Sequence, residues 1–308
     1  MRYFLSTTLF LSCAISTLAL ADSLNANLGN LKQQKKEFIR ELVVKDHFNQ
    51  TQLNHLFLTL HPNKKIIQCM TQPFEKEPWG YYRHFFLTSE RINLGAQYLK
   101  THHQALMRMQ RKYGIPASII TAIIGVETEY GEHLGKYSVL NSLYTLAFYY
   151  PPREKFFRNE LAQYLILTRD NHLNVLKIKG SYAGALGIPQ FMPSSYRHFG
   201  VAYHQNSPIN LFNNDDAIAS IANYFHKNGW QDGQPIANQL YSKAESPHRN
   251  AKLLELPVKK NYTQHWEIYK NFNVIMTYNH NIVYAMAVYQ LSKAIEKQYH
   301  THNPKFGS

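Results

Sequence analysis

The sequence is poor in cysteine. Two cysteines occur among its 308 residues, Cys13 in an apolar N-terminal stretch and Cys69 further along. If the chain is cleaved after Ala21, Cys69 alone remains, and a single thiol cannot form an internal disulfide. We therefore expect stability to come from a hydrophobic core. We interpret Cys69 as a packed apolar side chain rather than a nucleophile or part of a zinc site.

Motifs for binding metals, nucleotides and nucleic acids are also missing. Sixteen histidines are present, but none follows the H-E-x-x-H spacing of a zinc site. The glycine-rich stretch 179–196 lacks the Gly-Lys-Ser/Thr ending of a phosphate-binding loop. Basic residues are scattered rather than clustered. We expect no metal, no cofactor and no nucleic-acid partner.

Apolar runs long enough to matter for targeting are confined to the N-terminus. Residues 1–21 combine a positive charge at Arg2, a mostly apolar stretch and an A-x-A cleavage site that ends at Ala21. The stretch contains too many Ser and Thr residues for a membrane span. We expect a secretory signal that is cleaved after Ala21. Lipid attachment at Cys13 is the disfavoured alternative, because residues 10–12 are not the small residues that such a site needs.

Acidic residues are outnumbered by basic ones. The chain has 33 Lys and Arg against 20 Asp and Glu, a formal net charge of +13. Such a surface favours an anionic partner, although charge also serves general solubility. Hydrophobic residues make up 44% of the chain, enough for the core of one large domain or two small ones.

Helical periodicity dominates the sequence, and strand patterns are few and local. We expect a mainly α (α+β) fold with a small β insertion at residues 231–270, where short apolar runs alternate with polar residues. Helices are predicted over residues 28–60, 88–113 (capped by Thr88 or Ser89), 116–131, 141–149, 153–171, 216–227 (capped by Asn214 or Asp215) and 279–297.

One glutamate stands out from this pattern. Counting back from Glu127 by three, four and seven residues gives Ile124, Ile123 and Ile120, which lie on the same helix face. A carboxyl group on such a stripe is poorly hydrated, so we expect a raised pKa. A carboxyl that stays protonated near neutral pH can act as a general acid. The alternative is a surface-edge glutamate at a fraying helix end.

A partner for this carboxyl is not evident. Glu129 lies about 200° around the same helix, and Asp215 and Asp216 head a helix as caps do. Most glycoside hydrolases use two carboxylates, so a lone acid favours a mechanism in which one residue makes both proton transfers. The chain has 22 Tyr, 17 Phe and 3 Trp, which fits a glycan substrate bound by ring stacking, although the same rings also build cores.

The glycine-rich stretch allows two interpretations. Gly180, Gly184 and Gly187 indicate backbone that approaches something closely, with Ser181, Gln190 and Phe191 able to supply hydrogen bonds and a ring face to a ligand. The other interpretation is a tight structural turn.

Five segments taken together resemble the B-type lytic murein transglycosylases, a lysozyme-like group. The longest and most specific is residues 179–196, which resembles the central signature of that family. The others are an acid motif around Glu127, an upstream Trp-x-x-Tyr-Arg-x-x-Phe-like segment and two later segments, in order along the chain: residues 78–85, 125–131, 179–196, 216–225 and 278–285.

The resemblance implies an enzyme that cleaves the β-1,4 bond between N-acetylmuramic acid and N-acetylglucosamine in peptidoglycan. Glu127 would protonate the glycosidic oxygen, and its carboxylate would then take the proton from the muramic C6 hydroxyl, which closes a 1,6-anhydro ring. The resemblance also implies the residues that contact the glycan: Ser181, Gln190, Phe191, Tyr224, Tyr82, Tyr278, Asn279 and Tyr284. Gln190 with Phe191 would form a stacking platform with a polar edge.

The resemblance also implies an organisation and a location. We expect an N-terminal helical region at 22–75, a lysozyme-like core at 76–230, the β insertion at 231–270 and a closing helix at 271–300. We expect a periplasmic monomer that acts on glycan strands, with possible peripheral association with the envelope. Some relatives carry a calcium loop before residue 216, but the stretch 202–208 lacks the acidic ligands that such a loop needs.

Two alternatives remain open from the sequence. The first is an enzyme that hydrolyses the same bond, which needs a positioned water and usually a second acid. The second is a peptidoglycan-binding protein without activity, which an intact Glu127 beside a complete glycine-rich signature argues against.

Overall fold

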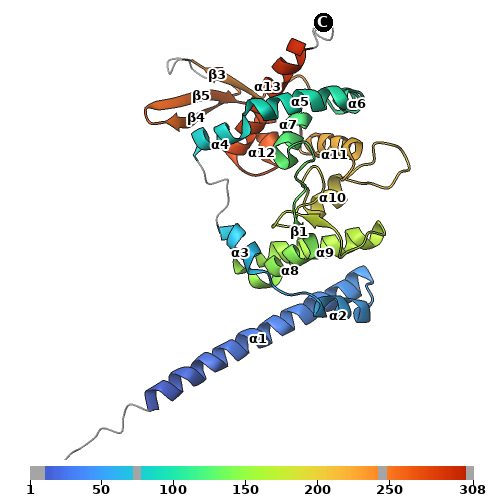
Figure 1. Ribbon diagram of the computed structural model, residues 1–308, viewed down its shortest axis with the longest axis vertical. Coiled ribbons are helices and arrows are strands. Elements are labelled where there is room, and N and C mark those ends of the chain that lie inside the picture. The colour runs from blue at the N-terminus through green and yellow to red at the C-terminus, as the bar shows by residue number, and fades with distance from the viewer. Residues whose placement is uncertain (1–10, 72–77, 242–247, 303–308) are drawn as a thin grey trace, which may run out of the picture.

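The computed structural model describes residues 11–71, 78–241 and 248–302. Helices dominate, and the two small sheets lie apart from each other (Figure 1). The mainly helical fold predicted from the sequence is therefore confirmed. The helices are α1 (Leu11–Asp46), α2 (Gln50–Leu58), α3 (Lys64–Thr71), α4 (Trp79–Phe86), α5 (Ser89–Thr101), α6 (His103–Tyr113), α7 (Ala117–Thr128), α8 (Val139–Tyr149), η2 (Pro151–Arg153), α9 (Glu154–Asp170), α10 (Pro193–Phe199), α11 (Asn214–Lys227), α12 (Lys270–Met276) and α13 (Ile282–His302).

The lower part of the molecule in Figure 1 is built from α1, α2 and α3 packed against α8 and α9. Aromatic rings hold it together, with the Phe38 centroid 5.9 Å from Phe57 and 5.7 Å from Phe148. The Lys35 ammonium of α1 also links α1 to α8 by hydrogen bonds, because it donates to the hydroxyls of Tyr144 (2.6 Å) and Tyr149 (3.0 Å).

Helix α7 lies in the middle of the upper part, where it packs against α5, α6, α11 and α13 (Figure 1). Ile119, Ile120, Ile123 and Ile124 are each at most 1% exposed. A helix that is apolar on nearly every side is stable only when neighbours cover it all round. This burial fixes the helix that carries Glu127.

The predicted β insertion is present as a three-stranded antiparallel sheet in the order β3-β5-β4. Its strands are β3 (Ala237–Leu240), β4 (Lys252–Lys259) and β5 (Tyr262–Ile268). β4 packs against α4. A second, two-stranded sheet pairs β1 (Tyr137–Ser138) with β2 (Lys179–Gly180), which brings the glycine-rich stretch beside the chain that follows α7.

Several predicted helix boundaries were wrong. The helix expected over 88–113 is two helices, because the chain leaves helical geometry at His102. The helix that carries Glu127 ends at Thr128 rather than Gly131, because Glu129 takes a left-handed conformation. Helix α11 is capped by Asn213, whose side chain accepts from the backbone of Asp215.

Residues 1–10 of the expected signal lie outside the described residues, and α1 begins at Leu11. Within the described ranges, none of the helices is both long and apolar enough to cross a bilayer.

Candidate active site

Glu127 lies in the last turn of α7, where the helix emerges from the core. Its side chain is half-buried. The Tyr284 hydroxyl of α13 donates to Glu127 Oε1 over 2.5 Å. Tyr284 is 1% exposed, so the donor is held by packing as well as by the bond. The carboxyl group is therefore anchored by one oxygen to a fixed phenol.

Aromatic side chains extend from this contact. The Tyr278 ring is stacked on Tyr284, with centroids 6.3 Å apart and planes at 12°. Tyr224 lies 5.0 Å from Tyr278 in an edge-on arrangement. Phe191 contacts both, at 5.7 Å from Tyr224 and 5.8 Å from Tyr278. The structure thus brings four predicted aromatic residues together beside Glu127.

Each tyrosine of this cluster has its hydroxyl fixed by a hydrogen bond. Tyr278 donates to the Pro189 carbonyl (2.6 Å) and Tyr224 to the Thr277 carbonyl (2.8 Å). Burial raises the pKa of Tyr278 and of Tyr284, and the negative charge of Glu127 raises both further. Phenols with raised pKa values stay protonated at neutral pH, so Tyr284 remains a donor to the carboxyl group.

A buried arginine holds the end of α7 in place. Arg91 of α5 is 8% exposed and donates from Nη1 to the Gly125 carbonyl (2.6 Å) and from Nη2 to Glu129 Oε1 (3.3 Å). The Tyr130 hydroxyl donates to the Arg91 carbonyl (2.7 Å). The carbonyls in the last turn of a helix lack partners within the helix, and Arg91 satisfies one of them.

The chain turns sharply directly after Glu127 and Thr128. Glu129 (φ 51°) and Tyr130 (φ 63°) are both left-handed, which is costly for residues with side chains. The turn is held because the Thr128 hydroxyl donates to the Ile188 carbonyl over 3.0 Å. At Gly125 a Cβ would lie 2.6 Å from the Tyr130 ring, so glycine is required for this ring to pack on α7.

The glycine-rich stretch folds against the protein itself. A Cβ on Gly180 would lie 2.0 Å from the Ala185 carbonyl oxygen, which is a backbone contact rather than a ligand site. The Ser181 hydroxyl accepts from the Ala185 amide (3.0 Å). Gln190, left-handed at φ 49°, donates to the Gly187 carbonyl (2.8 Å). Of the two interpretations of these glycines, the structural turn is the one that the structure supports.

Tyr82 and Asn279, two further predicted residues, lie next to the aromatic cluster. Tyr82 of α4 is 2% exposed and packs on Phe86 at 4.8 Å, and its phenol is near enough to Tyr284 to raise the pKa of that residue. Asn279 is half-buried and directly follows Tyr278. Phe191 is 3% exposed, so its ring is covered by protein, and its role as a stacking platform stays a prediction.

The acidic residues considered as partners of Glu127 have other roles. Glu129 pairs with Arg91 and with His133 Nε2 (3.2 Å). Asp216, predicted as a helix cap, instead accepts from the amides of Tyr203 (2.7 Å) and Asn210 (2.8 Å), and so fixes the loop before α11. Among the described residues, no three His, Cys, Asp or Glu side chains gather as a metal site would require.

Sequence reasoning missed Arg91, which orders the site without being an obvious motif. Its signal was present in the spacing of the buried face of α5, where Arg91, Gly95 and Tyr98 occur at i, i+4 and i+7. An arginine on a buried stripe needs partners, and the Gly125 carbonyl and Glu129 provide them.

Known proteins with this fold share the sequence pattern. A family model described as "Transglycosylase SLT domain" matches residues 30–293. Membrane-bound lytic murein transglycosylase B of Escherichia coli is 35% identical over 296 residues, covering 84% of this chain and 82% of that protein.

Solved structures agree in fold. The E. coli lytic transglycosylase Slt35, solved with bulgecin A, superposes with a TM-score of 0.81 at 34% identity, covering 86% of this chain and 93% of that one. Soluble lytic transglycosylase SltB1 of Pseudomonas aeruginosa gives a TM-score of 0.78 at 35% identity, covering 86% and 99%. The lysozyme-like architecture predicted from the sequence is thereby confirmed.

Proposed function

The chain belongs to the transglycosylase SLT domain family, and we propose that it cleaves the β-1,4 bond between N-acetylmuramic acid and N-acetylglucosamine of peptidoglycan with Glu127 as sole acid and base. The observation that carries this assignment is the 2.5 Å hydrogen bond from Tyr284 to Glu127 Oε1. A carboxyl group held in this way beside a cluster of buried phenols has a defined orientation, which proton transfer requires.

The hydrogen bond distinguishes the two carboxyl oxygens. Because Tyr284 donates to Oε1, we assign the proton of the neutral acid to Oε2. Oε2 transfers this proton to the glycosidic oxygen as the bond to C1 of the muramic acid breaks. The carboxylate then accepts the proton of the C6 hydroxyl while O6 bonds to C1. No water is consumed, the anhydro ring forms, and Glu127 ends protonated as it began.

The Tyr284 hydroxyl can donate to Glu127 both when the carboxyl group is neutral and when it is ionised. A phenol donor favours the carboxylate over the neutral acid, so it stabilises the charge that forms when the proton leaves. The Tyr278 ring, stacked on Tyr284, lies near the carboxyl group, whose negative charge raises the pKa of Tyr278. Ser181, Gln190 and Asn279 would supply polar contacts to the sugar, and Tyr82 and Phe191 would support the wall behind Tyr284 and Tyr278.

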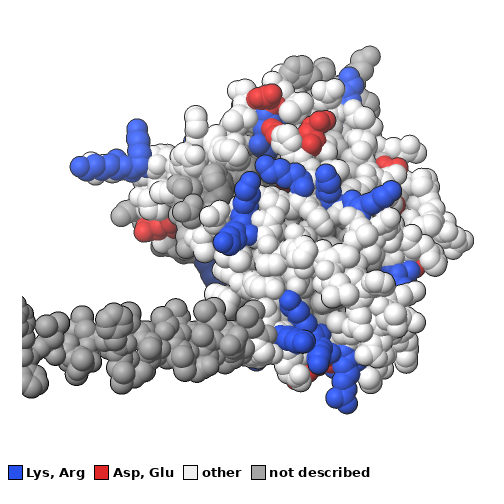
Figure 2. All heavy atoms as spheres, turned by 60° about the horizontal axis from the view of Figure 1, so that its bottom comes forward, with Lys and Arg blue, Asp and Glu red and all other residues white. Residues whose placement is uncertain are grey.

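The charge of the surface fits an anionic polymer. In the view of Figure 2, lysines and arginines outnumber acidic residues over the visible face, in line with the net charge of +13. We propose that the chain is exported after cleavage at Ala21 and acts in the periplasm as a monomer. We also propose the organisation expected from the sequence: a helical region at 22–75, a catalytic core at 76–230, a β insertion at 231–270 and a closing helix at 271–300. Sequencing the N-terminus of the exported protein tests the cleavage site.

Hydrolysis of the same bond is the alternative that the experiment must separate. Purified sacculi are digested in water enriched in oxygen-18, and the released muropeptides are analysed by mass spectrometry. Transglycosylation leaves 1,6-anhydro ends without the label, whereas hydrolysis places labelled oxygen on a reducing end. Labelled reducing ends as the main product would refute the proposed reaction.

Substitution of Glu127 tests the acid. Glu127→Gln keeps the size of the side chain and its bond to Tyr284 but cannot transfer the proton, so turnover is expected to be lost while binding to sacculi remains. Glu132→Gln, which changes an exposed carboxyl in the turn that follows α7, is the matched control and should keep activity. Normal release of muropeptides by Glu127→Gln would show that another group is the acid.

A further inference from the structure

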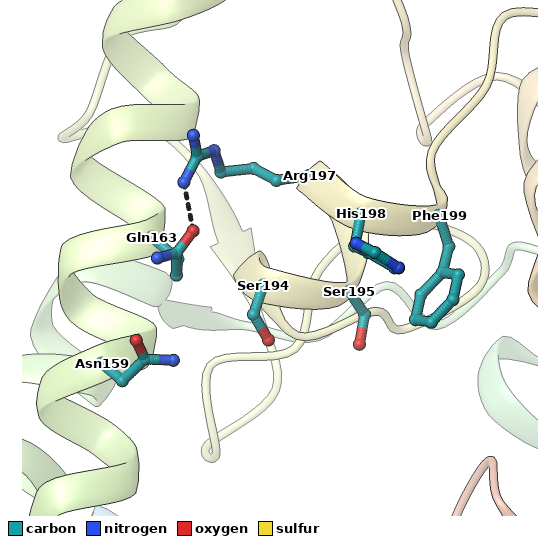
Figure 3. Close-up of a pocket in the computed structure, with 7 residues that line it drawn as sticks. All are labelled: Asn159, Gln163, Ser194, Ser195, Arg197, His198 and Phe199. Carbon is teal, nitrogen blue, oxygen red and sulfur yellow. Dashed lines mark hydrogen bonds between the residues drawn. The ribbon is translucent and has the colours of Figure 1, made fainter.

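Polar hollows also lie outside the cluster around Glu127. In the one between α9 and α10, the Arg197 guanidinium already donates to Gln163 Oε1 (Figure 3), so part of its donor capacity is used within the protein. A larger groove, with a volume of about 760 Å³, lies between strand β3 and helix α13 near the top of Figure 1. We call it the β3–α13 groove. Its charges, amides and exposed ring make it the strongest candidate for a second ligand site.

The β3–α13 groove carries positive charge. Arg83, Lys293 and Lys297 line it, and none of the lining residues that the structure describes is acidic. Lys293 Nζ bonds to Glu296 Oε2 (2.6 Å), but both side chains of this pair are largely in solvent, so the bond holds the ammonium only weakly. Lys297 is exposed one turn further along α13. The groove therefore favours an anionic ligand.

The floor of the groove is preformed. Arg83 Nε donates to Gln290 Oε1 (3.2 Å), and the indole of Trp266, which is 7% exposed, donates to Gln264 Oε1 (3.4 Å). Gln290 Nε2 is buried and has no hydrogen-bond partner within the described part of the chain. A buried amide donor without a partner costs free energy, so an acceptor atom of a ligand would be stabilised at this position.

An aromatic ring stands at the rim of the groove. Tyr241 is 88% exposed, more than any other large hydrophobic side chain of the described residues. Its ring is not needed for the core, and it offers a flat apolar face to a ligand. Asn238 and Gln239 of β3 add amide groups to the same wall. A ring face together with planar amides suits a sugar, and the cations suit acidic groups attached to it.

The groove lies on the opposite side of α13 from the candidate active site. At about 100° per residue, Lys293 and Lys297 lie about 180° and 220° around this helix from Tyr284, the residue that bonds to Glu127. A short glycan bound at Glu127 therefore does not occupy the groove, and a ligand in the groove belongs to a separate site.

We propose that the β3–α13 groove is a second binding site for an anionic, N-acetylated glycan, which holds the enzyme on peptidoglycan while Glu127 acts on another segment of the polymer. This inference goes beyond the proposed function and rests on it for the class of ligand. A β-strand of another protein is a poorer match, because the Tyr289 hydroxyl of α13 already bonds to the Ala237 carbonyl of β3 (2.6 Å). Two sites for one polymer raise the overall affinity above that of either alone.

Retention on purified sacculi tests the second site in the Glu127→Gln protein. Adding Lys293→Ala and Lys297→Ala is expected to lower the affinity for sacculi about fivefold, the size expected for two exposed charge contacts. Adding Tyr241→Ala instead, which leaves the net charge unchanged, should lower it about as much. In the enzyme with Glu127 intact, the same changes should leave kcat/KM on a short soluble glycan at the wild-type value, because that substrate occupies only the active site.

Lys32→Ala with Lys36→Ala is the matched control, since it removes two exposed charges four residues apart on α1 and should leave retention unchanged. Equal losses from the two lysine pairs would show general charge attraction and overturn the inference. So would unchanged retention in both groove variants, or a loss seen only with vesicles of anionic phospholipid. A wild-type enzyme that yields no anhydro ends would instead overturn the proposed function and leave the binding result standing.

Discussion

Tyr284→Phe isolates the contribution of one hydroxyl group. The ring should keep its stack on Tyr278, because phenylalanine has the same shape, while the 2.5 Å bond to Glu127 Oε1 is lost. A hydrogen bond to a charged group contributes about 1.5–3 kcal/mol. If most of this stabilises the carboxylate formed as the proton leaves, kcat falls about 10- to 100-fold, since each factor of ten corresponds to about 1.4 kcal/mol.

The assay is the rate of release of anhydro ends from sacculi, with kcat and KM determined separately. We expect kcat to fall while KM stays near its wild-type value, because the sugar contacts are unchanged. Tyr289→Phe is the control on the same helix, since its hydroxyl donates to the Ala237 carbonyl (2.6 Å) away from the acid. A folded Tyr284→Phe enzyme with wild-type kcat would refute the role given to this bond.

Two further predictions concern stability. Lys35→Met removes the bonds from α1 to two tyrosine hydroxyls of α8 and is expected to lower the free energy of unfolding by about 1–2 kcal/mol in urea titrations, whereas Lys36→Met, at an exposed position, should change it little. Burial raises the pKa of Glu267, but hydrogen bonds from His248 and Tyr269 outweigh it and hold that pKa at about 2, below the ordinary 4.5. This carboxylate therefore stabilises the fold fully above pH 4.5 and progressively less as the pH falls towards 2. The difference in melting temperature between the wild type and Glu267→Gln should therefore disappear over that pH range. A difference that does not depend on pH would contradict this reasoning.

Local patterns predicted the elements of this fold better than their ends. Thr88, one of the two predicted caps, does cap α5, and the segment that contains α5 and α6 ends at Tyr113 as predicted. The break at His102 escaped notice because no proline or glycine marks it. The end of α7 was also misplaced, because the left-handed turn at Glu129 is accompanied by contacts with residues distant in the sequence, from Arg91 to Glu129 and from Thr128 to the Ile188 carbonyl.

In the candidate site too, local sequence patterns were predictive, whereas contacts between residues distant in the sequence were not. The isoleucine stripe before Glu127 correctly indicated a helix in the core with a carboxyl group at its end. It could not show that Tyr284 would meet that carboxyl group, because the two residues are 157 positions apart. The family resemblance supplied the aromatic residues, but not the burial of Phe191, which depends on how Tyr224 and Tyr278 pack around it.

The contact between Glu127 and Tyr284 joins a residue in the first half of the chain to one near its end. The acid is made early in synthesis, whereas its phenol belongs to α13, the last helix of the described chain. An incompletely synthesised chain has the carboxyl group without the donor that orients it. On this reasoning the full rate is reached only once the C-terminal helix has docked against α7.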